Sequence, residues 1–407
     1  MRRRLRQFVD RFDRRVWPLV ATQLITAAGF SISLPFLSLY LHQQRGLSMT
    51  VVGLIMMISA VVAAVARLAG GEAADRIGRR PVLLGAFFLR VVSFVGMTIL
   101  IGLNGPVWGI AAVYMAARSS GGLAMPSISA MVADLTPQSR RMEAYGILRV
   151  GANVGWGIGP AVGGYLATVF PYAALFAFTA FTSAVALLLV GVYSPESRVG
   201  ERQAPGLTDL VATLGDRRFL TFVGLALLVL IVGGQLVSTL SVFTVDVLGL
   251  SEAQFGGLLT LNGLLVAALQ YPIARVAERF PRGRALIAGA LLYGGGYLLL
   301  GWFHAYAALL GVIVVVTLGE MVFAPTSLAV TAELAPPARR GRYMGAFGLA
   351  ESFGWSAGPF LGGVLLDAFP HRPPIMWGTI TSLAFLAVVG LRLWSRAAPA
   401  SARQAPG

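Results

Sequence analysis

Cysteine and lysine are both absent from this 407-residue chain, and only 12% of its residues are charged. The absence of cysteine excludes disulfides and thiolate metal sites. The three histidines, His42, His304 and His371, are too scattered along the chain to predict a metal site. A soluble domain carries about a quarter of its residues as charged groups. This chain therefore has too few charges to cover its surface in water.

Apolar residues are abundant instead: 57% of the chain is hydrophobic, and its mean hydropathy is +0.76. The apolar runs are long and continuous, which predicts membrane-spanning helices rather than barrel strands, whose apolar residues alternate. We therefore expect an all-α integral membrane protein with twelve transmembrane helices. The expected spans are 17–41, 50–70, 81–103, 107–133, 143–168, 171–193, 219–247, 253–274, 284–303, 306–332, 342–367 and 374–396.

The chain is strongly basic, with a formal net charge of +15, and apart from the three histidines all its basic residues are arginines. Arginines fill the N-terminal tail and every second loop, whereas the alternate loops hold only Arg45 and Arg372. This asymmetry places both termini in the cytoplasm. It also explains the positive charge as a belt beside the membrane, so we expect no nucleic-acid partner. Because no small-residue cleavage site follows the first apolar run, we interpret that run as span one and not as a signal peptide.

The only long polar stretch in the middle of the chain is SPESRVGERQAPGLTDLVATLGDRR, at residues 194–218. It separates six expected spans from six others. We therefore predict an N-terminal six-helix bundle at 1–193, a cytoplasmic linker at 194–218 and a C-terminal six-helix bundle at 219–407.

An internal repeat supports this division. The segment PSISAMVADLTPQSRR (126–141) matches PTSLAVTAELAPPARR (325–340) at an offset of 199 residues. In the same register, GWGIGPAVGG (155–164) matches GWSAGPFLGG (354–363). Span four therefore corresponds to span ten, and span five to span eleven. Six spans separate the copies, so both have the same orientation, as in the parallel repeat of major facilitator transporters.

The segment after span two, GGEAADRIGRRPVLL (70–84), combines glycines that permit a tight turn with charged residues that can pair. It resembles the major facilitator signature G-x-x-x-D-R-x-G-R-R, and the matching residues are Gly71, Asp75, Arg76, Gly78, Arg79 and Arg80. The resemblance implies that Asp75 interacts with the start of span eleven and that Arg79 pairs with Asp134. Together these contacts would latch the cytoplasmic side in the outward-open state. The second-half copy, ARVAERFPRGR (274–284), departs from the signature, with proline in place of the glycine.

Span five contains a run of small residues and one proline, which let helices pack backbone to backbone and bend the helix. These residues are Gly155, Gly159, Pro160, Gly163 and Gly164. The run resembles the antiporter signature of drug exporters, although its second copy makes helix packing part of the explanation. Nearly the whole chain resembles the twelve-span drug:proton antiporter branch of the superfamily. The stretches YPIARVAE (271–278) and RGRYMGAFGLAESFG (340–354) resemble the MdtH-like multidrug resistance transporters in particular.

Ionisable residues inside a membrane span are costly and are therefore functional candidates. Arg118 lies midway along span four and Glu320 midway along span ten, so we expect both to face the interior from opposite halves. Glu320 is the first candidate for a proton site, with Arg118 as its partner. Glu351 in span eleven is the second, and Arg149 in span five can pair with it. We interpret Arg67 and Arg90 as snorkelling to the inner surface. Further cavity candidates are Gln23, Asn153, Trp156, Gln235, Asn262 and Trp355.

We therefore expect a monomeric secondary transporter of the inner membrane that works by alternating access, with lipids as its surroundings. The expected cargo is a hydrophobic or amphipathic compound, cationic or zwitterionic, exported in exchange for protons. The chain has no ATP-binding signature, hydrolytic triad or metal set, so we expect neither a primary pump nor an enzyme, and no cofactor. Three alternatives stay open: a proton-coupled importer of a small metabolite, a lipid or lysolipid flippase, and a channel or non-transporting scaffold.

Overall fold

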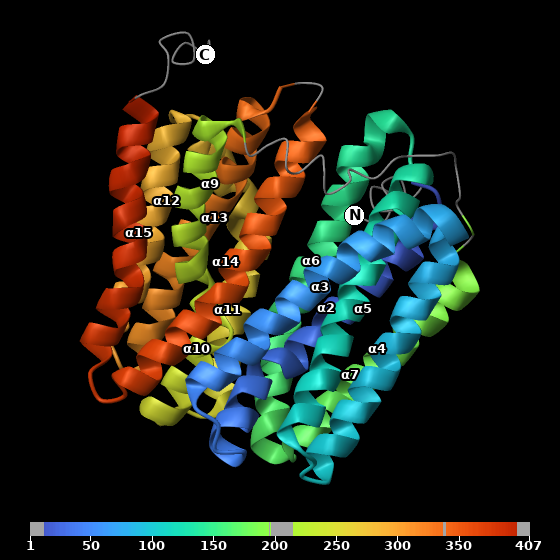
Figure 1. The fold of residues 1–407 in the computed structure, drawn as a ribbon, viewed down its shortest axis with the longest axis horizontal. Coiled ribbons are helices and arrows are strands. Elements are labelled where there is room, and N and C mark those ends of the chain that lie inside the picture. Colours follow the sequence, from blue (N-terminus) through green and yellow to red (C-terminus); the bar gives the residue numbers. More distant parts are fainter. Residues whose placement is uncertain (1–11, 195, 197–214, 337–338, 397–407) are drawn as a thin grey trace, which may run out of the picture. The chain divides into compact units, whose positions relative to one another are not determined.

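The structure, a computed structural model, describes residues 12–194, 196, 215–336 and 339–396 (Figure 1), and all regular secondary structure in these residues is helical. The long helices of the first half are α2 (Val16–Leu39), α3 (Met49–Ile77), α4 (Arg79–Gly102), α5 (Val107–Asp134), α6 (Arg141–Val169) and α7 (Tyr172–Tyr193). Those of the second half are α9 (Arg217–Gly233), α11 (Glu252–Ala277), α12 (Arg282–Leu299), α13 (Tyr306–Leu334), α14 (Arg340–Ala368) and α15 (Pro373–Arg396). These twelve helices correspond one by one to the expected spans.

The surface of these helices is that of a membrane protein. Eight of the described helices are long and apolar enough to cross a membrane by length and composition alone. Large apolar side chains such as Val65, Phe88, Phe181 and Leu188 are more than 60% exposed. Soluble proteins rarely expose large apolar patches without a partner, and here lipid would be that partner.

By the density of their contacts, the described residues divide into two compact units. Unit 1 consists of those within Met1–Leu47, Ile55–Ala204 and Thr244–Ala267. Unit 2 consists of those within Ser48–Leu54, Pro205–Phe243 and Ala268–Gly407. Helices α3 and α11 are thus divided between the units, whereas the other long helices each belong to one. Most of the predicted linker, 197–214, lies outside the described residues.

The same pairs of helices pack together in each unit. In unit 1, α2 packs against α6 and α7, and α4 packs against α5 and α7. In unit 2, α9 packs against α14 and α15, and α12 packs against α13 and α15, as Figure 1 shows for α12, α13 and α15. Each pair in unit 2 lies six spans after its counterpart in unit 1. The repeat found in the sequence therefore extends to the packing of the helices.

The first span of each half ends in the same way. Helix α2 continues into the π-helical turn η1 (Tyr40–Gln44), and span seven ends in the π-helical turn η5 (Phe243–Val247). Two residues after each π-helical turn stands a glycine with a left-handed backbone, Gly46 at φ 66° and Gly249 at φ 72°. Residues other than glycine rarely adopt this backbone conformation. The repeat therefore includes the first span, at an offset of 203 residues rather than 199.

Span seven is interrupted, whereas the sequence predicts one continuous helix over 219–247. Helix α9 is followed by the 3-10 turn η4 (Gly234–Leu236), the single turn α10 (Thr239–Val242) and η5. At the interruption the chain passes very close to α14, because a Cβ atom at Gly234 would lie 2.9 Å from the carbonyl oxygen of Trp355. A local change in helical winding accompanies this close backbone contact.

The divided helices α3 and α11 begin against helices of the other sequence half. In unit 2, the Asp367 carboxylate in α14 accepts hydrogen bonds from the backbone N–H of Met49 at 2.9 Å and of Thr50 at 2.7 Å. These N–H groups lack partners within α3, so Asp367 caps this helix from outside. In unit 1, a Cβ atom at Gly164 in α6 would lie 2.5 Å from the carbonyl oxygen of Glu252, the first residue of α11.

Candidate functional site

A buried ion pair fixes the start of α4 in unit 1. The side chain of Arg79, the first residue of α4, is 5% exposed and pairs with that of Asp134, which is 7% exposed and ends α5. Nη1 of Arg79 also donates a hydrogen bond to the carbonyl oxygen of Ala130 at 3.1 Å. A charge removed from water needs an opposite charge as its partner, and each of these two side chains supplies it to the other. The contact that the family signature implies is therefore present in the described residues.

A carboxylate outside the signature, Glu196, caps the same helix start. It accepts hydrogen bonds from the backbone N–H groups of Arg79 at 3.0 Å and Arg80 at 3.3 Å. The preceding Gly78 has a φ of 102°, and a Cβ atom there would lie 2.7 Å from Oε2 of Glu196. Glycine is therefore required both by the backbone and by the space. Sequence reasoning placed Glu196 in the linker, and its only signal was an acid directly after span six.

Among the remaining signature residues, Arg80 is partly buried and its Nη2 donates a hydrogen bond to the carbonyl oxygen of Gly191 at 2.8 Å, whereas Asp75 and Arg76 lie at the surface. Asp75 and Arg76 are exposed in the last turn of α3, and Arg76 pairs with Glu72 one turn earlier. An exposed pair of this kind contributes little to stability. A Cβ atom at Gly71 would meet its nearest neighbour, Pro126, at 4.0 Å, which is ordinary contact. Packing in unit 1 therefore demands Gly78 but not Gly71.

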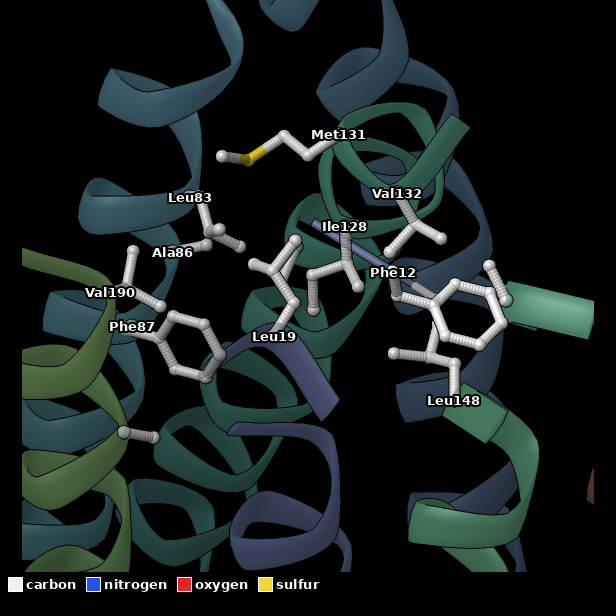
Figure 2. Close-up of a cluster of buried hydrophobic side chains, with 13 residues drawn as sticks. Phe12, Leu19, Leu83, Ala86, Phe87, Ile128, Met131, Val132, Leu148 and Val190 are labelled. Atoms are coloured by element: carbon white, nitrogen blue, oxygen red, sulfur yellow. The ribbon is translucent and has the colours of Figure 1, made fainter. Parts of the chain in front are cut away.

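Figure 2 shows a cluster of buried apolar side chains that packs between helices of unit 1. Met131 and Val132 come from the last turn of α5, directly before Asp134, and Leu83 from the second turn of α4. The full cluster is Phe12, Leu19, Leu83, Ala86, Phe87, Ala124, Ile128, Met131, Val132, Ala144, Leu148, Ala186 and Val190. Because it joins α2, α4, α5, α6 and α7, it fixes the end of α5 against the start of α4 and so positions Asp134 beside Arg79.

Unit 2 has the equivalent ion pair in an exposed position. Arg282 begins α12 as Arg79 begins α4, and Glu333 is the repeat counterpart of Asp134. Nε of Arg282 lies 3.0 Å from Oε1 of Glu333, but the two side chains are 37% and 55% exposed. The second copy of the signature has therefore lost its glycine and its burial while keeping the pairing. Solvent screening leaves such a pair weak.

Two arginines and a tryptophan meet around one phenylalanine in the interior of unit 1. The guanidinium carbons of Arg90 in α4 and Arg118 in α5 lie 5.4 and 5.5 Å from the ring centre of Phe30 in α2. Trp156 in α6 contacts the same ring edge-on, at 6.2 Å between centres. Two of the predicted residues, Arg118 and Trp156, are thus brought together. Phe30 itself carries no signal in the sequence, because an aromatic residue in an apolar span is typical of core packing.

The interpretation of Arg90 as a snorkelling side chain is wrong. Arg90 is 8% exposed, and its Nη2 donates a hydrogen bond to the carbonyl oxygen of Thr26 at 3.2 Å. Its guanidinium carbon also lies 5.6 Å from the ring centre of Phe94, one turn further from the start of α4. The side chain therefore points into the unit and away from the arginine-rich helix start, because α2 offers it a carbonyl and aromatic rings.

In unit 2, both predicted carboxylates lie near one buried tyrosine. Glu320 in α13 and Glu351 in α14 are each close enough to Tyr293 in α12 for their charges to act on its phenol, and Glu320 also acts on Tyr297. The rings of Tyr293 and Tyr297 are stacked 6.0 Å apart. The hydroxyl of Tyr297 donates a hydrogen bond to the carbonyl oxygen of Gly233 at 3.3 Å. The sequence does not single out this tyrosine pair, which looks like ordinary core.

The other predicted cavity residues are divided between the units. Gln23, Asn153 and Asn262 in unit 1 and Trp355 in unit 2 are all partly buried, and Arg149 in unit 1 is exposed.

Gln235 is fully buried in unit 2 at the interruption of span seven. Its Nε2 donates hydrogen bonds to the carbonyl oxygens of Ile231 at 3.0 Å and Gly358 at 2.9 Å. Gln235 therefore joins span seven to α14, which is a packing role.

The glycine runs of α6 and α14 are surfaces of close helix packing. A Cβ atom at Gly155 would lie 2.5 Å from the carbonyl oxygen of Leu24 in α2, and one at Gly354 would lie 2.6 Å from Cβ of Leu230 in α9. The glycines that lie against the first span of their half are Gly155, Gly159 and Gly163 in α6, and Gly354, Gly358 and Gly362 in α14. Close packing thus accounts for the glycines in both copies.

Comparison with known proteins agrees with this architecture. The sequence profile of the Major Facilitator Superfamily matches residues 19–258 and, overlapping them, residues 225–407. The chain belongs to the major facilitator superfamily. Within the superfamily it is similar to the multidrug resistance protein MdtH of Klebsiella pneumoniae, with 27% identity over 382 residues that cover 91% of this chain and 92% of the relative. It is also similar to the MFS-type transporter YttB of Bacillus subtilis, with 24% identity over 88% of this chain and 90% of the relative.

A solved structure of the nucleoside transporter NupG has the same fold, with a TM-score of 0.79 over 94% of this chain and 100% of that one. The sequence identity of 12% restricts this likeness to the fold. The superfamily, its MdtH relatives and the apolar helices together establish a multi-pass membrane transporter.

Proposed function

We propose that this transporter exports hydrophobic or amphipathic compounds in exchange for protons, and that it works by alternating access. The similarity to MdtH supports efflux. The observation that carries the proton coupling is the pair of carboxylates, Glu320 and Glu351, next to buried Tyr293. The arginine-rich loops support an inner-membrane location with both termini in the cytoplasm.

The carboxylates suit proton coupling because of where they lie. An ionised carboxylate inside the hydrocarbon region is costly, so it is best neutralised by a proton whenever water is excluded. Glu320 and Glu351 come from neighbouring helices, α13 and α14, and both act on the phenol of Tyr293. A change in hydration of this cluster would then load or release a proton. Glu320, which also acts on Tyr297, is our first choice for the coupling site.

The ion pair of Arg79 and Asp134, together with the cap by Glu196, is our proposed conformational latch. It holds the start of α4 rigidly to the ends of α5 and α7 in unit 1. Asp75, Arg76 and Arg80 flank this rigid point, and Asp75 is exposed and available for a contact that forms in one state only. The antiporter glycines of α6 provide a second close contact. We propose no enzymatic activity.

The test uses purified protein in proteoliposomes with an imposed pH gradient and a panel of amphipathic dyes of each charge. We expect gradient-driven transport by the wild type, loss of it in Glu320→Gln, and retention in Glu351→Gln. Glu143→Gln, which neutralises an exposed acid in the first turn of α6, is the matched control. If neither interior variant changes the gradient-driven transport, proton coupling at this cluster is refuted.

Direction and mechanism are tested in the same vesicles. Export requires that dye moves against the proton flux, and movement of dye with the protons would favour an importer. Single-channel currents in a planar bilayer would contradict alternating access.

A further inference from the structure

Among the residues that the structure describes, the interior of unit 1 contains arginines but no carboxylate. The acidic residues of unit 1 that the structure describes lie at helix ends or next to them: Asp13, Glu72, Asp75, Asp134, Glu143, Glu196, Asp246 and Glu252. The segments 16–47, 55–71, 76–133 and 144–193, which make up most of the unit, have none. Arg90 and Arg118 therefore lie in helices that offer no internal counter-charge.

The two guanidinium groups gather at Phe30 in spite of their like charge. They come from different helices, and they are close enough for the charge of Arg118 to act on Arg90. The Nε atoms of both are buried, and neither has a hydrogen-bond partner among the described residues. Contact with an aromatic face and one carbonyl compensates a buried cation only in part. Within the described residues of unit 1, the two cations therefore have no anion beside them.

We propose that Arg90, Arg118 and Phe30 form the binding site for the acidic group of an amphipathic organic anion. Guanidinium groups bind carboxylate and sulfonate oxygens through paired, charge-assisted hydrogen bonds. Phe30 and Trp156 supply an aromatic surface beside these donors for the apolar body of the ligand. Arg118 is only partly buried, so a ligand can reach it. This inference rests on the proposed transport function and narrows its cargo to compounds with an acidic group. Of the cargo types expected from the sequence, a zwitterion can carry such a group, whereas a purely cationic compound does not.

The repeat shows that the site is specific to unit 1. An offset of 203 residues relates the ends of spans one and seven, and also the starts of α4 and α12. At this offset, Gly233 is the counterpart of Phe30, and Tyr293 is the counterpart of Arg90. The offset of 199 places Thr317 at the position of Arg118. Unit 2 thus has neither the ring nor the cations at these positions. Helix packing alone does not require two arginines here, because the equivalent helices pack without them.

The experiment measures binding to the purified full-length protein with three fluorescent probes that differ in charge. Dansylglycine carries a carboxylate, dansylglycinamide is its neutral amide, and dansylcadaverine carries an amine. We expect the wild type to bind dansylglycine about tenfold or more tightly than the other two, as two charge-assisted contacts allow. Arg118→Gln and Arg90→Gln should each weaken dansylglycine binding about tenfold and leave the amide unchanged. Arg118→Lys should retain part of the preference.

Arg67→Gln is the matched control, because it removes an exposed arginine of α3 in the same unit. It should leave all three affinities unchanged. Equal binding of the three probes by the wild type, or tighter binding of dansylcadaverine, overturns the inference without need of a variant. So does a preference for dansylglycine that survives in Arg118→Gln.

The two proposals fail separately. If dansylglycine is preferred through Arg90 and Arg118 but no probe moves under a pH gradient, the proton-coupled transport is refuted and the anion site stands. If probes move under the gradient with no arginine-dependent preference, the anion site is refuted and the transport stands.

Discussion

Neutralising Asp134 should destabilise the transporter far more than neutralising its repeat counterpart Glu333. Asp134→Asn keeps the shape of the side chain but leaves the guanidinium of Arg79, which is 5% exposed, without its counter-charge. Breaking a buried ion pair from one side costs about 3–5 kcal/mol. Glu333→Gln removes a pair whose side chains are 37% and 55% exposed, and exposed pairs contribute about 0–1 kcal/mol. The two substitutions change the same charge at equivalent places, so burial is the main difference.

The assay is thermal unfolding of the purified variants in one detergent at one protein concentration. At roughly 2–4 °C per kcal/mol for a unit of about 200 residues, Asp134→Asn should lower the midpoint by roughly 6–20 °C. Glu333→Gln should lower it by less than about 4 °C. Equal shifts for the two variants would refute the argument from burial.

A double variant tests the cause of the loss. If the cost of Asp134→Asn is an unpaired buried cation, removing that cation as well should recover part of the stability. Asp134→Asn with Arg79→Gln should therefore unfold at a higher temperature than Asp134→Asn alone. A double variant that is less stable than the single one would show that lost packing or hydrogen bonds, rather than uncompensated charge, dominate.

Three further predictions concern helix contacts. Gly159→Val should lower the free energy of unfolding by about 1–3 kcal/mol through overpacking, because a Cβ atom at Gly159 would lie 2.6 Å from the carbonyl oxygen of Ala28. The control Gly311→Ala, where the space around the Cβ position is open, should leave the unfolding midpoint unchanged. Asp367→Ala should lower the free energy of unfolding by about 0.5–2 kcal/mol and increase hydrogen exchange at the first amides of α3. Exchange rates equal to those of the wild type at these amides would contradict the prediction. Gly78→Ala should cost about 1–2 kcal/mol through its φ of 102°, and an unchanged unfolding midpoint would argue against strain at this turn.

Features encoded locally were predictable from the sequence. The twelve spans follow from continuous apolar runs, because each helix must cover the hydrocarbon by itself. The contact of Arg79 with Asp134 is not local and was implied only by the resemblance to the family signature, and the structure places the two in an ion pair. The repeat was visible in residues 126–141 and in the glycine run of α6, each of which has a copy 199 residues later. The roles of these residues in transport stay predictions.

Features that depend on contacts between distant segments were not predictable. Glu196 caps α4 from 117 residues away, and its spacing resembles no local cap. Arg90 looked like a surface arginine because the carbonyl and the rings that hold it come from the fold and not from its neighbours in sequence. The interruption of span seven lies at a close contact with α14, which an apolar run of normal length does not reveal. In each case the deciding partner belongs to another helix.

The two candidate sites occupy equivalent positions in the repeat and have diverged in charge. In unit 1, a Cβ atom at Gly121 would lie 4.0 Å from Nη1 of Arg90. Its repeat counterpart in unit 2 is Glu320, and the counterpart of Arg90 is Tyr293, on which Glu320 acts. One copy of the same helix contact thus holds a cation beside a glycine, and the other holds a carboxylate beside a phenol. Both copies of a duplicated bundle can keep their packing glycines because both must be stable. The proposed exchange of an acid for a proton would need, in addition, one cationic site and one protonatable site. If unit 1 holds the cationic site and unit 2 the protonatable one, these positions must differ between the units while the packing around them is preserved.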